Sequence, residues 1–406
     1  MGTYSKFYKE VFLRGIWKSP YAHHEDVYFA KVNLWREAHL FPKELTKFLC
    51  DGAKGESLHV VFKRGELFNC SETLIYEIDP KYNFKPPVFL KDLKLRLGRF
   101  YPLSFFKNLR GIHKGNPYPG RIIAVNAEKE KMLLDANVPL SYYQVELSVE
   151  IHDVLPKETE LGGRCRDFIE EAFRVGPGMQ VRYDHVPTDF GLDEKESFIR
   201  EDENKDSIFY QEPRFIGHID RACHQSLVSY YTRILPKKAK ILDLMSSYES
   251  HLPENDELEV VGLGLNLEEL KANPRLREHV VKDLNEDPVL PFESEVFDAV
   301  ICDLSIEYVV KPFELIKEIK RVLKKGGLVS FSFSNRYFPT KVIKLWVDLH
   351  EFERMGYVLE LLIRTGFTDL HTFSFRGLPR PADDRWIAQS RVADPLYVVW
   401  GKKDEG

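Results

Sequence analysis

The sequence predicts a two-domain protein, with an N-terminal α+β domain followed by a C-terminal α/β domain. Three observations support this fold class. The chain has 406 residues, which suggests two or three domains at about 100–200 residues each. Short strand-like runs dominate residues 25–156, whereas strand-like and helix-like segments alternate from residue 215 onward. Alternation of that kind is typical of a parallel sheet covered by helices.

The first domain is expected at residues 25–156, after an N-terminal extension at residues 1–24. Its strand-like runs are rich in β-branched and aromatic residues, and most are bounded by Gly, Pro or Asn. Only the segment at 42–52 has helical spacing, with Leu45, Phe48 and Leu49 on one face. One helix among antiparallel strands indicates an α+β domain.

Residues 157–212 are expected to form a connector. It contains a predicted helix at 166–174, which ends at the Gly-Pro-Gly turn of residues 176–178. A densely charged run follows, which is typical of an exposed segment.

The second domain is expected at residues 213–406, with a mostly parallel, seven-stranded sheet. Helices are predicted at 222–235, 312–323 and 357–366. Strand-like runs occur at 239–245, 259–265, 279–284, 297–304 and 327–334, and an antiparallel hairpin closes the sheet near the C-terminus. In an open α/β sheet the ligand lies at the carboxyl ends of the strands, so the residues there are the candidate site.

Those strand ends carry a recognisable pattern. The runs ILDL, VVGLGLN, VVKDLNEDPVLPF, FDAVICDLSIEYV and VLKKGGLVSFSFSN resemble a class I S-adenosylmethionine-dependent methyltransferase of the type-11-like kind. The resemblance covers residues 213–402 and implies a Rossmann-like fold, S-adenosylmethionine as cofactor and methyl transfer as the activity. It also implies a set of cofactor-binding residues: Asp243, Met245, Ser246, Ser247, Gly262, Gly264, Asn266, Asp283, Leu284, Cys302 and Leu304.

Two features depart from the family pattern. The glycine-rich loop is replaced by Met245, Ser246 and Ser247, and the acidic residue that would hold the ribose falls at Gly264. Asn266 replaces that acid, or the ribose is held differently. The loop is nevertheless similar to a branch of methyltransferase-like proteins with the pattern LDLMSSW-x-SHLP, preceded by FY-x-x-PRF-x-x-HID. A decayed site would be irregular, whereas these departures are patterned.

Candidate catalytic bases are His218, Asp220 and His251, because a base is needed when the methyl acceptor arrives protonated. Arg214 is expected to pair with the cofactor carboxylate through its guanidinium. Purely structural roles for Arg214, His218 and His251 remain open. No third ligand stands at useful spacing beside these His and Asp residues, so no metal site is expected.

The first domain resembles an FKBP-type prolyl isomerase of the SlyD kind. The resemblance rests on a run of matching positions at 42–56 and on DANVPLSYYQVELSVE at 135–150. Val138 stands where that family has His, and Ser141-Tyr142 replaces Ala-Gly. The aromatic pocket residues are not recognisable, so weak or no isomerase turnover is expected.

Charge and composition exclude several partners. The formal net charge is −5, which does not favour nucleic acid, and no run approaches the ~20 apolar residues of a membrane helix. Five scattered cysteines and no export signal predict a cytoplasmic protein. The sequence therefore predicts a methyltransferase that acts on an unidentified small or polar acceptor, either a small molecule or a protein, with an FKBP-like accessory domain. The alternatives are a non-catalytic binding or chaperone-like protein and an active prolyl isomerase.

Overall fold

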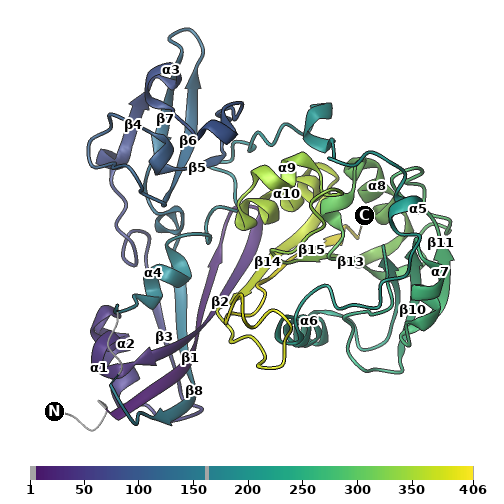
Figure 1. Ribbon diagram of the computed structural model, residues 1–406, viewed down its shortest axis with the longest axis horizontal. Coiled ribbons are helices and arrows are strands. Elements are labelled where there is room, and N and C mark those ends of the chain that lie inside the picture. The colour runs from purple at the N-terminus through teal and green to yellow at the C-terminus, as the bar shows by residue number, and fades with distance from the viewer. Residues whose placement is uncertain (1–5, 161–163, 406) are drawn as a thin grey trace. The chain divides into compact units, whose positions relative to one another are not determined.

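A computed structural model describes residues 6–160 and 164–405 (Figure 1). The chain divides into two compact units. The first unit extends to Gly191, and the second begins at Leu192 and also takes in residues 21–23. Each unit has its own set of buried hydrophobic residues.

The main sheet of the first unit packs against the amphipathic helix α2. Its strands lie in the order β2-β1-β8-β3, and β8 is antiparallel to both β1 and β3. Leu45 and Leu49 of α2 are fully buried together with Val149 and Ile151 of β8. The elements of this layer are β1 (Phe7–Lys18), β2 (Ala22–Asn33), α1 (Leu34–Glu37), α2 (Lys43–Asp51), β3 (Ser57–Phe62), β8 (Val145–Pro156) and α4 (Phe168–Phe173).

A second, smaller sheet lies in the chain between β3 and β8. Its strands follow the order β4-β7-β6-β5, and Ile78, Ile122 and Leu134 are fully buried in a separate apolar cluster. The elements of this layer are β4 (Ile75–Ile78), α3 (Pro80–Asn83), β5 (Phe100–Pro102), β6 (Pro119–Asn126) and β7 (Lys131–Asp135).

The boundaries of the units differ from those expected. Residues 7–18 are not an extension, because they form β1 along the whole length of β8. Residues 157–191 belong to the first unit, because α4 buries Phe168 and Phe173 in its core. The rest of the expected connector belongs to the second unit, where the buried carboxylate of Asp206 accepts a hydrogen bond from Arg200 at 2.7 Å.

The strands of the second unit lie in the order β11-β10-β9-β12-β13-β15-β14. The strands β11, β10, β9, β12 and β13 are parallel to one another, whereas β15 is antiparallel to both β13 and β14. Figure 1 shows α9 and α10 on one side of these strands and α6 on the other. The strands are β9 (Ala239–Leu244), β10 (Leu258–Gly264), β11 (Leu276–Val281), β12 (Phe297–Asp303), β13 (Leu323–Phe333), β14 (Phe367–Arg376) and β15 (Leu396–Lys403). The helices are α5 (Asp206–Phe209), α6 (Arg221–Ile234), α7 (Leu267–Ala272), α8 (Pro312–Val322), α9 (Lys344–Asp348) and α10 (Glu351–Arg364).

The sheet of the second unit has a topological switch point. The strand order runs outward from β9 to β11 on one side and from β12 onward on the other. The connections therefore diverge at β9 and β12, which leaves a crevice at their carboxyl ends. Asp243, Gly264 and Asp303 stand at or next to the carboxyl ends of three neighbouring strands, and Asp283 follows β11. The fold thus places the expected site residues at one edge. Among the described residues, none of the helices combines the length and apolarity that a transmembrane helix needs.

Two glycines of the first unit allow a matched test of packing. Gly178 has φ +93°, and a Cβ there would lie 2.5 Å from the backbone carbonyl carbon of Pro139. Gly65 has φ +80° and open space around it. We expect Gly65→Ala to lower the free energy of unfolding by about 1 kcal/mol, which is the cost of a left-handed side chain. Gly178→Ala is expected to cost on the order of 3 kcal/mol, because backbone must also shift. Denaturant unfolding measures both values, and equal losses would contradict the packing shown.

Candidate functional site

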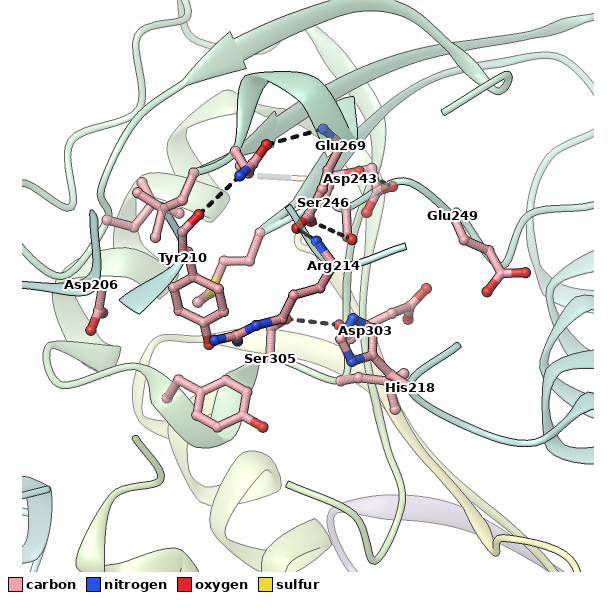
Figure 2. A pocket seen from close by; sticks show the side chains of 18 of the residues that line it. Asp206, Tyr210, Arg214, His218, Asp243, Ser246, Glu249, Glu269, Asp303 and Ser305 are labelled. Atoms are coloured by element: carbon pink, nitrogen blue, oxygen red, sulfur yellow. Dashed lines mark hydrogen bonds between the residues drawn. The ribbon is translucent and has the colours of Figure 1, made fainter. Parts of the chain in front are cut away.

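A pocket opens at the carboxyl edge of the second unit's sheet (Figure 2). It holds about 970 Å³ of space, its open mouth included. The expected residues that line it are Arg214, His218, Asp243, Met245, Ser246, Ser247, His251, Gly264, Asn266, Asp283, Leu284 and Leu304. Asp220, Gly262 and Cys302 are not among its lining residues.

Asp243 anchors the loop that lacks glycine. Its Oδ2 accepts hydrogen bonds from the hydroxyls of Ser246 at 2.8 Å and Ser250 at 2.6 Å. Asn273 donates in turn to the Ser250 hydroxyl at 2.9 Å. The hydroxyl of Ser247 donates to Glu269 at 2.6 Å. Side-chain hydrogen bonds therefore hold a loop that glycines would otherwise shape by backbone conformation.

The loop approaches β10 closely enough to explain the missing acid. A Cβ on Gly264 would lie 2.2 Å from the backbone oxygen of Ser246. The Ser246 amide also donates to the Leu263 carbonyl at 2.9 Å. Met245 adopts φ +55°, a conformation that costs a side-chain-bearing residue about 1–2 kcal/mol. Position 264 therefore has no room for a carboxylate side chain. The backbone strain of the loop is located at Met245.

Asn266 holds the chain around the pocket rather than presenting a free amide. Its oxygen caps α7 by accepting from the amides of Glu268 and Glu269, at 3.0 and 3.2 Å. Its nitrogen donates to the carbonyls of Tyr210 and Gln211. The expected role of Asn266 at a ribose stays a prediction.

Arg214 presents a shielded and unpartnered nitrogen. Its guanidinium carbon lies 4.2 Å from the ring centre of Phe209 and 5.0 Å from that of Phe338. Nη2 donates to the Phe209 carbonyl at 3.0 Å, whereas Nη1 is buried and has no hydrogen-bond partner among the described residues. In Figure 2 the side chain extends beside the Tyr210 ring in the pocket. A buried guanidinium with a free donor is suited to a carboxylate ligand.

Among the described residues, Asp303 presents a second unpartnered atom in this pocket, and this atom is a hydrogen-bond acceptor. Its Oδ1 accepts from the hydroxyls of Tyr231 and Ser332, each at 2.5 Å. Its Oδ2 is buried and lacks a hydrogen-bond partner in the part of the chain that the structure describes. Burial raises the pKa of Asp303 to about 7, and the carboxylate of Asp243 adds to this shift. Burial likewise raises the pKa of Asp243 to about 6, against the lowering effect of its two serine hydroxyls.

The expected bases have different surroundings. His218 lines the pocket 5.8 Å from the ring of Phe338, and burial lowers its pKa. The pKa of His251 falls to about 3 because of burial and the neighbouring His224. Asp220 instead caps α6 by accepting from the Cys223 amide, and it accepts from the Asp394 amide at 2.6 Å.

Cys302 and Gly262, also expected to bind the cofactor, lie within strands and not at the pocket. Cys302 is fully buried in β12, and burial raises the pKa of its thiol well above the usual value. Gly262 lies in β10, where a Cβ would meet Leu276 at 2.4 Å. We infer that both shape the sheet under the pocket.

Sequence reasoning assigned no binding role to several lining residues, which are Asp206, Tyr210, Glu249, Ser250, Leu265, Glu269, Lys282, Tyr308 and Phe338. Glu269 accepts from the Arg214 amide at 2.7 Å as well as from Ser247. Its only signal in the sequence is an acidic residue in the first turn of a helix, which is common without any function. Phe338 comes from a loop, where no periodicity marks a lining residue.

Part of this unit is similar to known proteins. Residues 247–331 match the family model described as a methyltransferase domain. A malonyl-[acyl-carrier protein] O-methyltransferase from Marinomonas sp. (strain MWYL1) is 33% identical over 66 residues, which are 16% of this chain. Residues 247–331 of the second unit are therefore similar to a methyltransferase domain, and the resemblance seen in the sequence implies S-adenosylmethionine as the cofactor. The match spans about a quarter (24%) of the length of that curated relative.

Solved structures align with this chain at low similarity. A methyltransferase from Bacillus halodurans has 16% identity and a TM-score of 0.32, over 45% of this chain and 99% of its own. A possible histamine N-methyltransferase from Thermotoga maritima has 16% identity and a TM-score of 0.35, over 45% and 91%. Likeness at this level does not bear on function.

The pocket's chemistry fits this cofactor at its amino-acid end. S-adenosylmethionine ends in a carboxylate and an ammonium group. Arg214 Nη1 is a buried cationic donor without a partner, and Asp303 Oδ2 is a buried acceptor without one, among the described residues. Both residues line the same pocket, so the two unpaired atoms match the two charges of such a group.

Restoring the family's acid tests the loop geometry. We expect Gly264→Asp to lower the melting temperature and to abolish binding of S-adenosylhomocysteine, because the new side chain would displace the Ser246 carbonyl. Leu267→Asp serves as control, because this nearby side chain is 43% exposed. Calorimetry and thermal melting report both effects. If Gly264→Asp bound the ligand more tightly, the close approach of the loop would be wrong.

Proposed function

We propose that this protein transfers a methyl group from S-adenosylmethionine to a small or polar acceptor. The cofactor supplies the methyl group as an activated sulfonium. The observation that carries the proposal is the pair of buried, unpartnered atoms of Arg214 and Asp303 in one pocket at the carboxyl edge of the sheet. In this proposal Arg214 holds the cofactor carboxylate and Asp303 its ammonium, and Asp283 and Leu284 flank the adenine.

The remaining lining residues suit positioning rather than strong acid–base chemistry. Methyl transfer is an in-line displacement, which depends mainly on alignment of the two reacting groups. His218 is the candidate base, because its lowered pKa keeps the imidazole neutral at physiological pH and it lines the pocket. His251, with a pKa of about 3, is too weak a base for that role. Asp220 is engaged in joining α6 to the Asp394 segment, so we assign it a positioning role.

The acceptor would enter beside aromatic side chains. Tyr210, Tyr308 and Phe338 line the pocket together with His218. The curated relative is named for a malonyl-[acyl-carrier protein] acceptor, but the match covers only a quarter of that protein. We therefore leave the acceptor as a small molecule or a protein, and we retain the expectation of a cytoplasmic protein without nucleic-acid or membrane partners.

For the first unit we propose an FKBP-like accessory domain. The support is the packing of α2 against β8 and the insertion of a small sheet between β3 and β8. The Val138 and Ser141-Tyr142 replacements favour a binding role over prolyl isomerisation.

Replacing Arg214 tests the cofactor site directly. We expect Arg214→Met to weaken S-adenosylhomocysteine binding by about 10- to 100-fold, because a charged hydrogen bond is worth about 1.5–3 kcal/mol. Methionine keeps much of the packing against Phe209 and Phe338. Arg277→Met, in the exposed part of β11, is the control. Titration calorimetry measures the dissociation constants. No binding by the wild type would overturn the proposed function.

Asp303 makes cofactor binding depend on pH. An acid whose pKa is about 7 is mostly protonated below that pH, and a neutral carboxyl must lose its proton to pair with an ammonium group. Affinity should therefore rise by up to about tenfold per unit from pH 6 to pH 7 and level off above pH 8. Asp303→Asn should bind weakly with a flatter pH profile. Dissociation constants of S-adenosylhomocysteine at several pH values provide the test, and a profile unchanged by the substitution would exclude this role.

A further inference from the structure

Three metal-ligand side chains meet beside the cofactor pocket. His224 comes from the first half of α6, and Glu249 and His251 come from the segment after β9. The Nδ1 atoms of the two histidines lie 2.8 Å apart, and Glu249 Oε1 lies 3.6 Å from His224 Nδ1. One ligand atom from each residue lies within 4.8 Å of the others.

Hydrogen bonds anchor both chain segments that carry these three side chains. Asp220 caps α6 through the Cys223 amide. The segment that carries Glu249 and His251 is tied to Asp243 through the hydroxyl of Ser250, the residue between them. Ligands held by independent anchors lose little conformational freedom when they bind an ion.

The contact between the histidines is also close to what a shared ion requires. A tetrahedral zinc ion at about 2.0–2.1 Å from each nitrogen places the two nitrogens about 3.3 Å apart. The observed 2.8 Å needs an opening of only about 0.5 Å. Without an ion, one imidazole must donate its proton to the other, so the ordinary alternative is a single hydrogen bond between neutral histidines.

The cluster has an access route from solvent. His224 and Glu249 line an open groove together with Gln225, Tyr248 and Arg275. The side chains of His224 and Glu249 are 27% and 38% exposed, respectively. His251 is buried and borders the cofactor pocket. Three protein ligands with an open side are the arrangement of zinc sites that accept a further ligand.

We propose that His224, Glu249 and His251 form a binding site for a divalent transition metal of the Zn²⁺ type. Two imidazoles and one carboxylate suit such an ion better than Mg²⁺ or Ca²⁺, which favour all-oxygen sites. The remaining coordination positions face the groove and accept water or an oxygen or sulfur ligand. This site is independent of the methyl-transfer proposal.

The test is metal binding by the full chain. The protein is treated with a chelator and dialysed, and then titrated with Zn²⁺ in a calorimeter and with Co²⁺ under visible spectroscopy. We expect one equivalent to bind, with ligand-field bands for Co²⁺. His224→Ala should weaken binding by at least about tenfold, the loss that even outer-shell partners can cause. Because His224 is partly exposed, this variant should fold even if His251→Ala does not.

Controls separate a specific site from casual binding. His279→Ala removes an exposed histidine of β11 and should leave the affinity for Zn²⁺ unchanged. Glu249→Gln keeps the shape but loses the charge and should give an intermediate affinity. If the wild type does not bind Zn²⁺, the proposal is wrong. It is also wrong if folded His224→Ala binds Zn²⁺ with unchanged affinity. Calorimetry with S-adenosylhomocysteine on the same samples reports the cofactor site separately.

Discussion

The site in the second unit depends on the hydrogen bonds that the buried carboxylate of Asp243 accepts from the loop after β9. In the related pattern this loop is shaped by glycines, whose freedom allows the backbone to turn closely around a ligand. Here Ser246 and Ser250 donate their hydroxyls to one oxygen of Asp243, and Asn273 extends the network. Because the carboxylate is buried, these hydrogen bonds also compensate for the loss of its hydration.

That network has consequences for its neighbours. With the loop drawn toward β10, the Ser246 carbonyl lies over Gly264, so no side chain fits there. Met245 then carries a positive φ that glycine would adopt without cost. Two departures that look separate in the sequence, the lost glycines and the lost acid, therefore have one structural cause.

Buried charge distinguishes this pocket from a merely structural crevice. The carboxylate of Asp243 raises the cost of ionising Asp303, and Arg214 keeps one nitrogen unpaired among the described residues. Unpaired buried polar atoms are expensive in a folded protein. Their presence at the carboxyl edge of the sheet, where ligands of this fold bind, is best explained by a charged ligand that completes them.

The sequence by itself determined the parallel strands, the helix at α2 and the edge of the sheet that carries Asp243 and Asp283, because strand and helix periodicity and strand-end position are local properties. Only the tertiary structure decided that residues 7–18 form a strand, since its partner β8 lies more than a hundred residues away. It also decided that Glu269 meets Ser247 and that His224 meets His251. These contacts join residues that are far apart in the chain, and no helical or strand periodicity links them. A sequence pattern therefore cannot predict them.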